Sequence, residues 1–121
     1  MGYIDLHCDT LMQAFLAGQK NAVRLEKAMA DLERLETGGC AAQFFAIFMP
    51  PMAYRARYGD AIPDDETYIR LLRGILQNTM EARPDRLAPA AGAADLERCR
   101  REGKIAAFLT LEDGRPVDGK L

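Results

Sequence analysis

Two short motifs place residue types that commonly bind metal ions directly after apolar segments of the chain. His7 and Asp9 follow the first apolar segment, and Glu112 follows the apolar run at residues 105–111. In an extended backbone, side chains two residues apart point to the same side. His7 and Asp9 can therefore coordinate one metal ion, while Cys8 points away from it. The two oxygens of Glu112 could bridge two cations. The spacing therefore predicts a metal site of the kind used in hydrolysis.

The apolar pattern of the whole chain predicts strands that alternate with helices. Short runs rich in Ile, Leu and Phe predict strands at residues 3–6, 40–49 and 105–111. Apolar residues at helical spacing predict helices at residues 24–36 and 64–83. A short helix or turn is expected at residues 10–17 and a short helix at residues 95–102, each followed by glycine. The remaining stretches are expected to form a surface loop at residues 52–61 and an Ala-rich connector at residues 87–94.

Strands separated by helices indicate a parallel sheet, because right-handed crossovers are the usual connection between them. In open α/β sheets and in (β/α)8 barrels, ligand sites form beyond the carboxyl ends of the strands. His7 and Asp9 follow the first predicted strand, and Glu112 follows the third. The sequence therefore predicts that these three side chains meet at one edge of the sheet.

The composition is that of a folded domain without a nucleic-acid or membrane partner. The chain has 121 residues, of which 49% are hydrophobic and 28% charged, and its formal net charge is −2. Lys and Arg are scattered, which argues against nucleic-acid binding. No stretch reaches the roughly 18 apolar residues of a membrane span, and the start of the chain does not resemble a signal peptide, so a cytoplasmic location is expected. Three widely separated cysteines predict reduced thiols.

Each motif also has a plain structural interpretation. A lone His-x-Asp pair occurs by chance in many sequences, and Asp113-Gly114 is a common turn signal, so Glu112 could simply precede a turn. Cys8 lies between the two expected ligands, but it should point away from them, and core packing is a better prediction than a role as nucleophile. Residues 54–58, with two tyrosines and two arginines, could line a substrate entrance or form an exposed surface loop.

The order and intervals of several segments resemble the start of a membrane dipeptidase chain (renal dipeptidase, peptidase family M19). The matching segments are residues 4–11 (IDLHCDTL), 31–35 (DLERL), 38–39 (GG), 43–46 (QFFA) and 109–114 (LTLEDG). Members of this family are (β/α)8 barrels of the metal-dependent hydrolase type that hydrolyse dipeptides. The resemblance implies an α/β fold: the N-terminal part of such a TIM barrel, with about three parallel strands and intervening helices.

The resemblance also implies roles for the residues that match the family pattern. His7 and Asp9 match the ligands of one zinc ion (Zn²⁺), and Glu112 matches the carboxylate that bridges both zinc ions, which makes it a candidate catalytic residue as well. In the complete enzymes a hydroxide held between the two metals attacks the dipeptide. The family's remaining histidine ligands, and its substrate-binding arginine and aspartate, lie later in its chains and are absent from these 121 residues.

We therefore expect residues 1–121 to form a single incomplete domain that binds at most one zinc ion weakly and is inactive by itself. The parent protein is expected to be a binuclear zinc dipeptidase whose partners are dipeptide substrates. The alternative is a non-catalytic α/β binding or assembly module. Either way, three parallel strands with two unpaired edges predict self-association or a missing part of the barrel, because open edges expose backbone donors and apolar surface.

Overall fold

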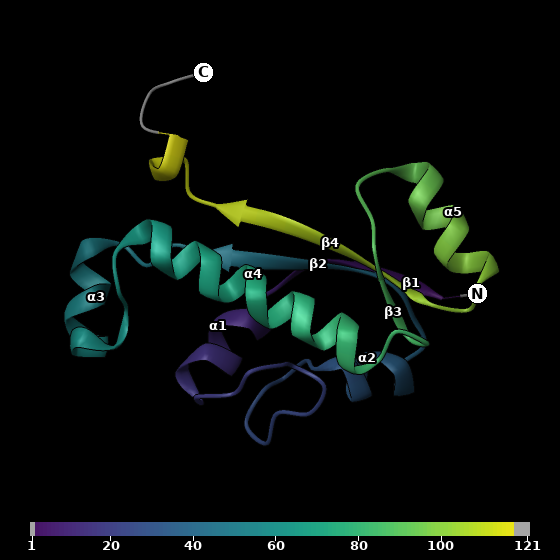
Figure 1. The fold of residues 1–121 in the computed structure, drawn as a ribbon, viewed down its shortest axis with the longest axis horizontal. Helices are drawn as coiled ribbons and strands as arrows, with labels where there is room; N and C mark the ends of the chain where they lie inside the picture. The colour runs from purple at the N-terminus through teal and green to yellow at the C-terminus, as the bar shows by residue number, and fades with distance from the viewer. Residues whose placement is uncertain (1, 118–121) are drawn as a thin grey trace.

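The computed structural model describes residues 2–117 and shows a parallel sheet flanked by helices (Figure 1). The strands are β1 (Tyr3–Cys8), β2 (Cys40–Phe48), β3 (Leu87–Pro89) and β4 (Ile105–Glu112). The helices are α1 (Thr10–Leu16), α2 (Leu32–Thr37), α3 (Met52–Tyr58), α4 (Asp65–Ala82) and α5 (Ala93–Arg101). Short 3-10 turns follow at η1 (Gly59–Ala61) and η2 (Arg115–Val117). The predicted parallel α/β architecture is confirmed.

The sheet has the strand order β1-β2-β4-β3, and all of its pairings are parallel. The longest pairing joins β2 and β4 without interruption from Ala42 and Ala106 to Phe48 and Glu112. Both strands are largely apolar, as expected for strands covered on their faces. Because this pairing ends at Glu112, the carboxyl ends of β2 and β4 are level, and the loops after them begin side by side.

The short strand β3 lies in the stretch that the sequence predicted to be a connector, so the sheet has four described strands rather than three. Leu87, Ala88 and Pro89 pair with Ile105, Ala106 and Ala107. An Ala-rich run that contains a proline does not read as a strand, but proline is tolerated at the edge of a sheet, and β3 is an edge strand. From β1 through β2 to β3 the chain moves toward one edge of the sheet, and from β3 to β4 it moves back toward β2.

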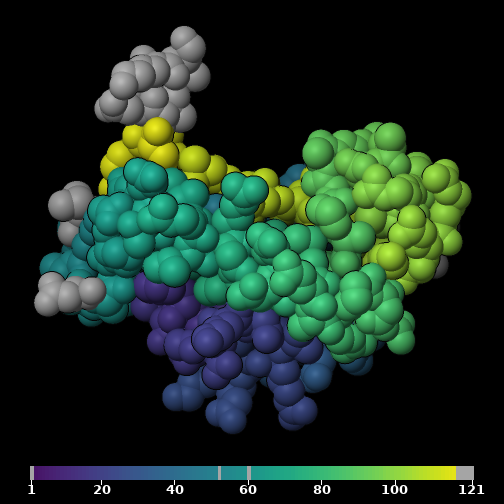
Figure 2. Space-filling view, viewed as in Figure 1, coloured from purple at the N-terminus to yellow at the C-terminus, as the bar shows by residue number. Residues whose placement is uncertain are grey.

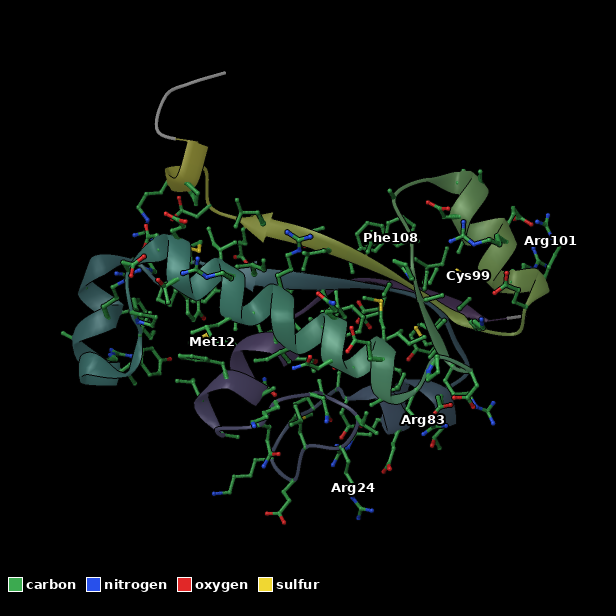
Figure 3. The ribbon with its side chains drawn as sticks, viewed as in Figure 1. Met12, Arg24, Arg83, Cys99, Arg101 and Phe108 are labelled. Carbon is green, nitrogen blue, oxygen red and sulfur yellow. The ribbon has the colours of Figure 1, made fainter. Side chains whose placement is uncertain are left out.

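This reversal separates the helices onto two faces of the sheet, because right-handed connections in opposite directions pass over opposite faces. The larger hydrophobic core joins buried residues of α1, α2 and α4 to β2. A smaller cluster packs Cys99 of α5 against Ala42 and Ala106 of the sheet, with Phe108 at its margin. The helix α5 lies apart from the other helices (Figure 1) and forms a lobe at one end of the molecule (Figure 2). Cys99 and Phe108 lie near each other in Figure 3.

The helix predicted at residues 24–36 is wrong over most of its length, because only α2 is helical there. The buried carboxylate of Asp31 accepts hydrogen bonds from the backbone N–H groups of Leu25 and Arg34, both at 2.9 Å. The first bond holds the preceding loop in an irregular path, and the second caps the start of α2. The apolar residues at helical spacing before Asp31 therefore pack into the core from a loop.

The surface loop predicted at residues 52–61 is also wrong, since α3 and η1 occupy it. Pro51 precedes the first turn of α3, and its carbonyl accepts hydrogen bonds from the N–H groups of Tyr54 (2.7 Å) and Arg55 (3.1 Å). The other predicted helices are confirmed with shifts of one or two residues at their ends. In α4, Asp64 caps the first turn by accepting from the N–H of Thr67 at 2.9 Å.

Candidate metal centre

The structure brings His7, Asp9 and Glu112 together at the carboxyl ends of the strands. His7 lies on β1, Asp9 is the residue before α1, and Glu112 is the last residue of β4. The Nε2 atom of His7 lies 3.4 Å from Oδ1 of Asp9 and 3.5 Å from Oε2 of Glu112. We call these three residues the triad. The two motifs therefore meet at one edge of the sheet, as the sequence predicted.

Local backbone structure explains how the N-terminal motif presents its side chains. The pairing of β1 with β2 shifts register between Asp5 and Cys8, which is the kind of irregularity that redirects side chains next to functional sites. The side chain of Asp5 accepts from the N–H of His7 at 3.3 Å. Cys8 is buried in the larger core, so the prediction that it packs there is confirmed. Asp9 precedes α1 without a side-chain hydrogen bond to it, so its carboxylate is not used in capping.

The distances within the triad suit a divalent cation. Ligand atoms about 2.0–2.2 Å from a tetrahedral zinc ion are separated from one another by about 3.4 Å. The two measured separations from His7 are 3.4 and 3.5 Å, and one ligand atom from each residue lies within 4.8 Å of the others. Two carboxylates balance the charge of a divalent ion, and neutral imidazole completes a donor set common at catalytic metals. The residues present therefore fit one metal ion.

The triad is open to solvent, which leaves room for further ligands. The side chains of His7, Asp9 and Glu112 are 52%, 46% and 48% exposed. His7 is the only histidine of the chain, and no second cluster of His, Cys, Asp or Glu with this spacing occurs among the side chains that the structure describes. A second ion bridged by Glu112 would need ligands from elsewhere.

Comparison with known proteins decides the family. The family model of membrane dipeptidases (peptidase family M19) matches residues 1–121. The chain belongs to the membrane dipeptidase family. No match was found among curated proteins.

Two similar solved structures support this M19 assignment at the level of the fold. A metallopeptidase from Rhodobacter sphaeroides, liganded with a phosphinate mimic of the dipeptide L-Ala-D-Ala, is 20% identical with a TM-score of 0.67; the match covers 93% of this chain and 38% of that one. A structure described as dipeptidase AC, a metallopeptidase of family M19, is 22% identical with a TM-score of 0.67; the match covers 94% of this chain and 37% of that one. The described strands are part of a (β/α)8 barrel, and the chain spans little more than a third of these structures.

In this M19 chain a pocket of about 330 Å3 adjoins the triad. All three triad residues line it, and the remaining lining residues are Met12, Gln13, Leu16, Phe48, Tyr54 and Tyr58. Tyr54 and Tyr58 come from the segment for which the sequence left open a substrate entrance or a surface loop. The arginines of that segment do not line the pocket: Arg55 pairs with Asp65, and Arg57 lies over the ring of Tyr54. The position of this segment directly after the strand at residues 40–49 was readable from the sequence, whereas its helical structure was not.

Other polar residues near the M19 motifs have structural roles. Asp113 has a φ of 108°, and its side chain accepts from the N–H of Arg115 at 2.8 Å, so the Asp-Gly turn exists directly after Glu112. Burial raises the pKa of the Cys8 thiol, which disfavours the reactive thiolate. All three cysteines of the chain are free and buried. No helix in the described part of the chain is long and apolar enough to span a bilayer.

Proposed function

We propose that this chain supplies the first metal ligands of a zinc-dependent dipeptidase. The observation that carries the proposal is the triad: three ligand-type side chains from two distant motifs converge at the carboxyl ends of parallel strands in an M19 chain. Catalytic sites in barrels of this kind are built at that face. Family membership and the geometry of the triad support the same reaction class.

Each triad residue has a distinct role in this proposal. His7 and Asp9 would hold one zinc ion, and Glu112, at the end of β4, would offer a carboxylate to it and to a second ion. When bound, the metals activate water as a nucleophile and polarise the peptide carbonyl. The two carboxylates balance cation charge, and the imidazole of His7 must be neutral to donate its lone pair.

The substrate class follows from the family and from the size of the pocket. The Rhodobacter sphaeroides relative was solved with a dipeptide mimic, and the pocket beside the triad measures about 330 Å3. That volume lies within the roughly 300–1,000 Å3 of small-molecule sites. We propose dipeptides as substrates.

Catalysis in this proposal belongs to a complete barrel. Four strands are described, whereas a closed barrel of this type has eight, and the chain spans 38% of the first related structure. The second ion needs ligands beyond those of residues 2–117. The isolated 121 residues are expected to bind at most one metal ion, weakly, and to hydrolyse no dipeptide.

The test uses the whole protein that contains this chain. Bound metal is measured by elemental analysis, and hydrolysis of Ala-Ala is followed with and without a chelator. We expect about two zinc ions per chain and activity that a chelator abolishes. Glu112→Gln should keep the side-chain shape but lose metal affinity and lower kcat by at least about a hundredfold, as removal of a metal-binding group does.

Asp113→Asn is the matched control, because it removes the neighbouring carboxylate, which lies in the turn and not in the triad. It should leave metal content and kcat within about twofold of the wild type. Full activity in Glu112→Gln, or dipeptide hydrolysis that survives complete removal of metal, would contradict the proposed function.

A further inference from the structure

The pocket beside the triad has a charged part and an aromatic part. The charged part is the triad itself. The rest of the lining is mostly apolar and comes from α1, from the end of β2 and from α3: Met12, Gln13, Leu16, Phe48, Tyr54 and Tyr58. A pocket that combines reactive polar groups with an apolar wall is suited to a ligand with a polar reacting centre and an apolar side chain.

The aromatic part begins directly next to the metal ligands. Phe48 is the register partner of Glu112 in the sheet, so an aromatic ring and a ligand carboxylate occupy adjacent strand ends. Tyr58 is half-buried and packs against the larger core, whereas Tyr54 is 47% exposed at the rim. A ligand side chain placed beside the triad therefore meets fixed aromatic surface inside and more open aromatic surface outside.

The helix that carries the two tyrosines is tied to the start of α4. Arg55 of α3 pairs with Asp65 at the start of α4, and Asp65 also lies 3.2 Å from Nε of Arg115 in η2. The guanidinium carbon of Arg57 lies 4.8 Å from the centre of the Tyr54 ring, a cation–π contact that restricts this exposed side chain. We call Tyr54 and Tyr58 the aromatic wall of the pocket. These contacts give the aromatic wall a defined position before a ligand binds.

We propose that Tyr54 and Tyr58 determine substrate specificity by receiving a bulky apolar or aromatic side chain of the dipeptide. The inference rests on the proposed dipeptidase function and adds a substrate preference to it. Contact between aromatic rings and burial of apolar surface both favour a large side chain over a methyl group. One such side chain in an apolar pocket changes kcat/KM by roughly tenfold to a hundredfold.

The experiment compares substrates within each variant of the complete metal-loaded enzyme. The kcat/KM values for Phe-Ala and Ala-Phe are each divided by that for Ala-Ala, and the larger ratio is the preference of that variant. A ratio is independent of the fraction of active enzyme, so partial unfolding of a variant does not affect it. Inhibition constants of the corresponding phosphinate dipeptide mimics provide a second measurement that requires no turnover.

Three kinds of variant separate the possible roles of the rings. Tyr54→Ala and Tyr58→Ala remove the aromatic surface and should lower the preference roughly tenfold. Tyr54→Phe and Tyr58→Phe keep the rings and should keep the preference. Tyr3→Ala is the control at the other end of β1, where a tyrosine of similar exposure (44%) lies outside the pocket lining, and it should change nothing.

The outcomes distinguish this inference from the function on which it rests. A wild-type enzyme that hydrolyses none of the three dipeptides contradicts the proposed function and, with it, the inference. A wild type that hydrolyses all three without preferring a bulky side chain overturns the inference alone. So do alanine variants that retain the preference, or phenylalanine variants that lose it, since the hydroxyl groups would then provide the recognition.

Discussion

Tyr68 of α4 is the largest side chain that the core buries completely, and its hydroxyl has no hydrogen-bond partner among the described residues. Its ring packs edge-on against Phe15 of α1, with 5.3 Å between the ring centres. Burial raises the pKa of Tyr68 to about 12, and neighbouring Tyr58 adds to the effect. The ring therefore contributes packing between two helices behind the triad, whereas the buried hydroxyl carries a desolvation cost.

Tyr68→Phe tests this division between ring and hydroxyl. Removing an unpartnered buried hydroxyl should leave the free energy of unfolding at neutral pH unchanged or raise it by up to about 1 kcal/mol. Because the pKa of Tyr68 is higher in the folded state than in the unfolded state, its contribution to stability is complete below pH 10 and is lost as the pH rises toward 12. The wild type should lose up to about 1.4 kcal/mol per pH unit more than Tyr68→Phe in this range.

Denaturant unfolding of the whole protein at several values between pH 8 and about pH 11.5 measures both effects. Tyr54→Phe is the control, since it removes a phenol from a half-exposed position. A loss of more than 1 kcal/mol at neutral pH in Tyr68→Phe would show that the hydroxyl makes a stabilising hydrogen bond.

At the scale of elements, Asp65 at the start of α4 connects that helix to α3 and to η2. Its carboxylate pairs with Arg55 of α3 and with Arg115 of η2, and Arg115 in turn donates to the carbonyl of Pro50 at 3.2 Å. The three charged side chains are between 19% and 33% exposed, so solvent screens their attraction only in part. The loops after β2 and β4 are thereby tied to the start of α4.

Asp65→Ala should release this connection. We expect a loss of about 1–2 kcal/mol in the free energy of unfolding, since two partly buried arginines lose their partner. Amide hydrogen exchange in residues 52–58 should become faster, and kcat/KM for bulky dipeptides should fall as the aromatic wall loosens. Both stability and exchange are measured in the whole protein.

Glu66→Ala is a closely matched control, because Glu66 is the next acidic residue in the first turn of α4. Its pair with Arg70 is 4.0 Å long, and the two side chains are 89% and 68% exposed, so it should contribute close to zero. Both substitutions remove one negative charge from the first turn of the same helix. The loss of the favourable interaction with the helix dipole is therefore the same in both variants and does not contribute to the difference between them. Equal losses in the two variants would show that this dipole, and not the contacts of Asp65, is responsible.

Sequence reasoning predicted the long elements and the triad because each leaves a local signature. The apolar runs of β2 and β4 and the caps of α4 are readable directly, and parallel strands force His7, Asp9 and Glu112 to one edge. A substrate entrance lined by Tyr54 and Tyr58 was one of two alternatives that the sequence left open, but the helix that carries these tyrosines was not predicted. A short helix of seven residues leaves little periodicity, and its place in the pocket depends on the pair between Arg55 and Asp65, which are ten residues apart.

The two other errors have a tertiary cause as well. The spacing of apolar residues before Asp31 suits a helix, but the buried Asp31 carboxylate binds the backbone of that stretch and starts α2 only afterwards. The strand β3 exists because β4 offers it an edge, which an Ala-rich run with Pro89 does not reveal. Zinc as the metal, the roles of the triad residues and a cytoplasmic location stay predictions.

For the whole molecule, exposed apolar residues mark the places where the sheet is open. On β1, which has a neighbour on one side only, Ile4 is 50% and Leu6 is 71% exposed. On β4, beyond the short pairing with β3, Leu109 is 40% and Leu111 is 44% exposed. In a closed barrel both strands would have neighbours on both sides, so these residues lie where further strands and helices of the barrel would pack.

The 121-residue chain by itself is therefore expected to self-associate. Unpaired strand edges and exposed leucines together favour edge-to-edge contacts, and light scattering at micromolar concentration should show oligomers or aggregates. Leu6→Lys and Leu109→Lys place charges at the two open edges and should each raise the monomer fraction several-fold. Met29→Lys is the control, since Met29 is 90% exposed on the loop between α1 and α2, away from both edges.

The same two substitutions should have the opposite consequence in the complete barrel. There, lysine would occupy a position that neighbouring elements bury, and the free energy of unfolding should fall by about 2 kcal/mol or more in each variant. Met29→Lys should stay within about 0.5 kcal/mol of the wild type in both settings, because exposed positions tolerate such changes. A stable monomer of the 121 residues that unfolds cooperatively would contradict the open-edge argument. It would favour the alternative in which this α/β unit stands alone as a binding module.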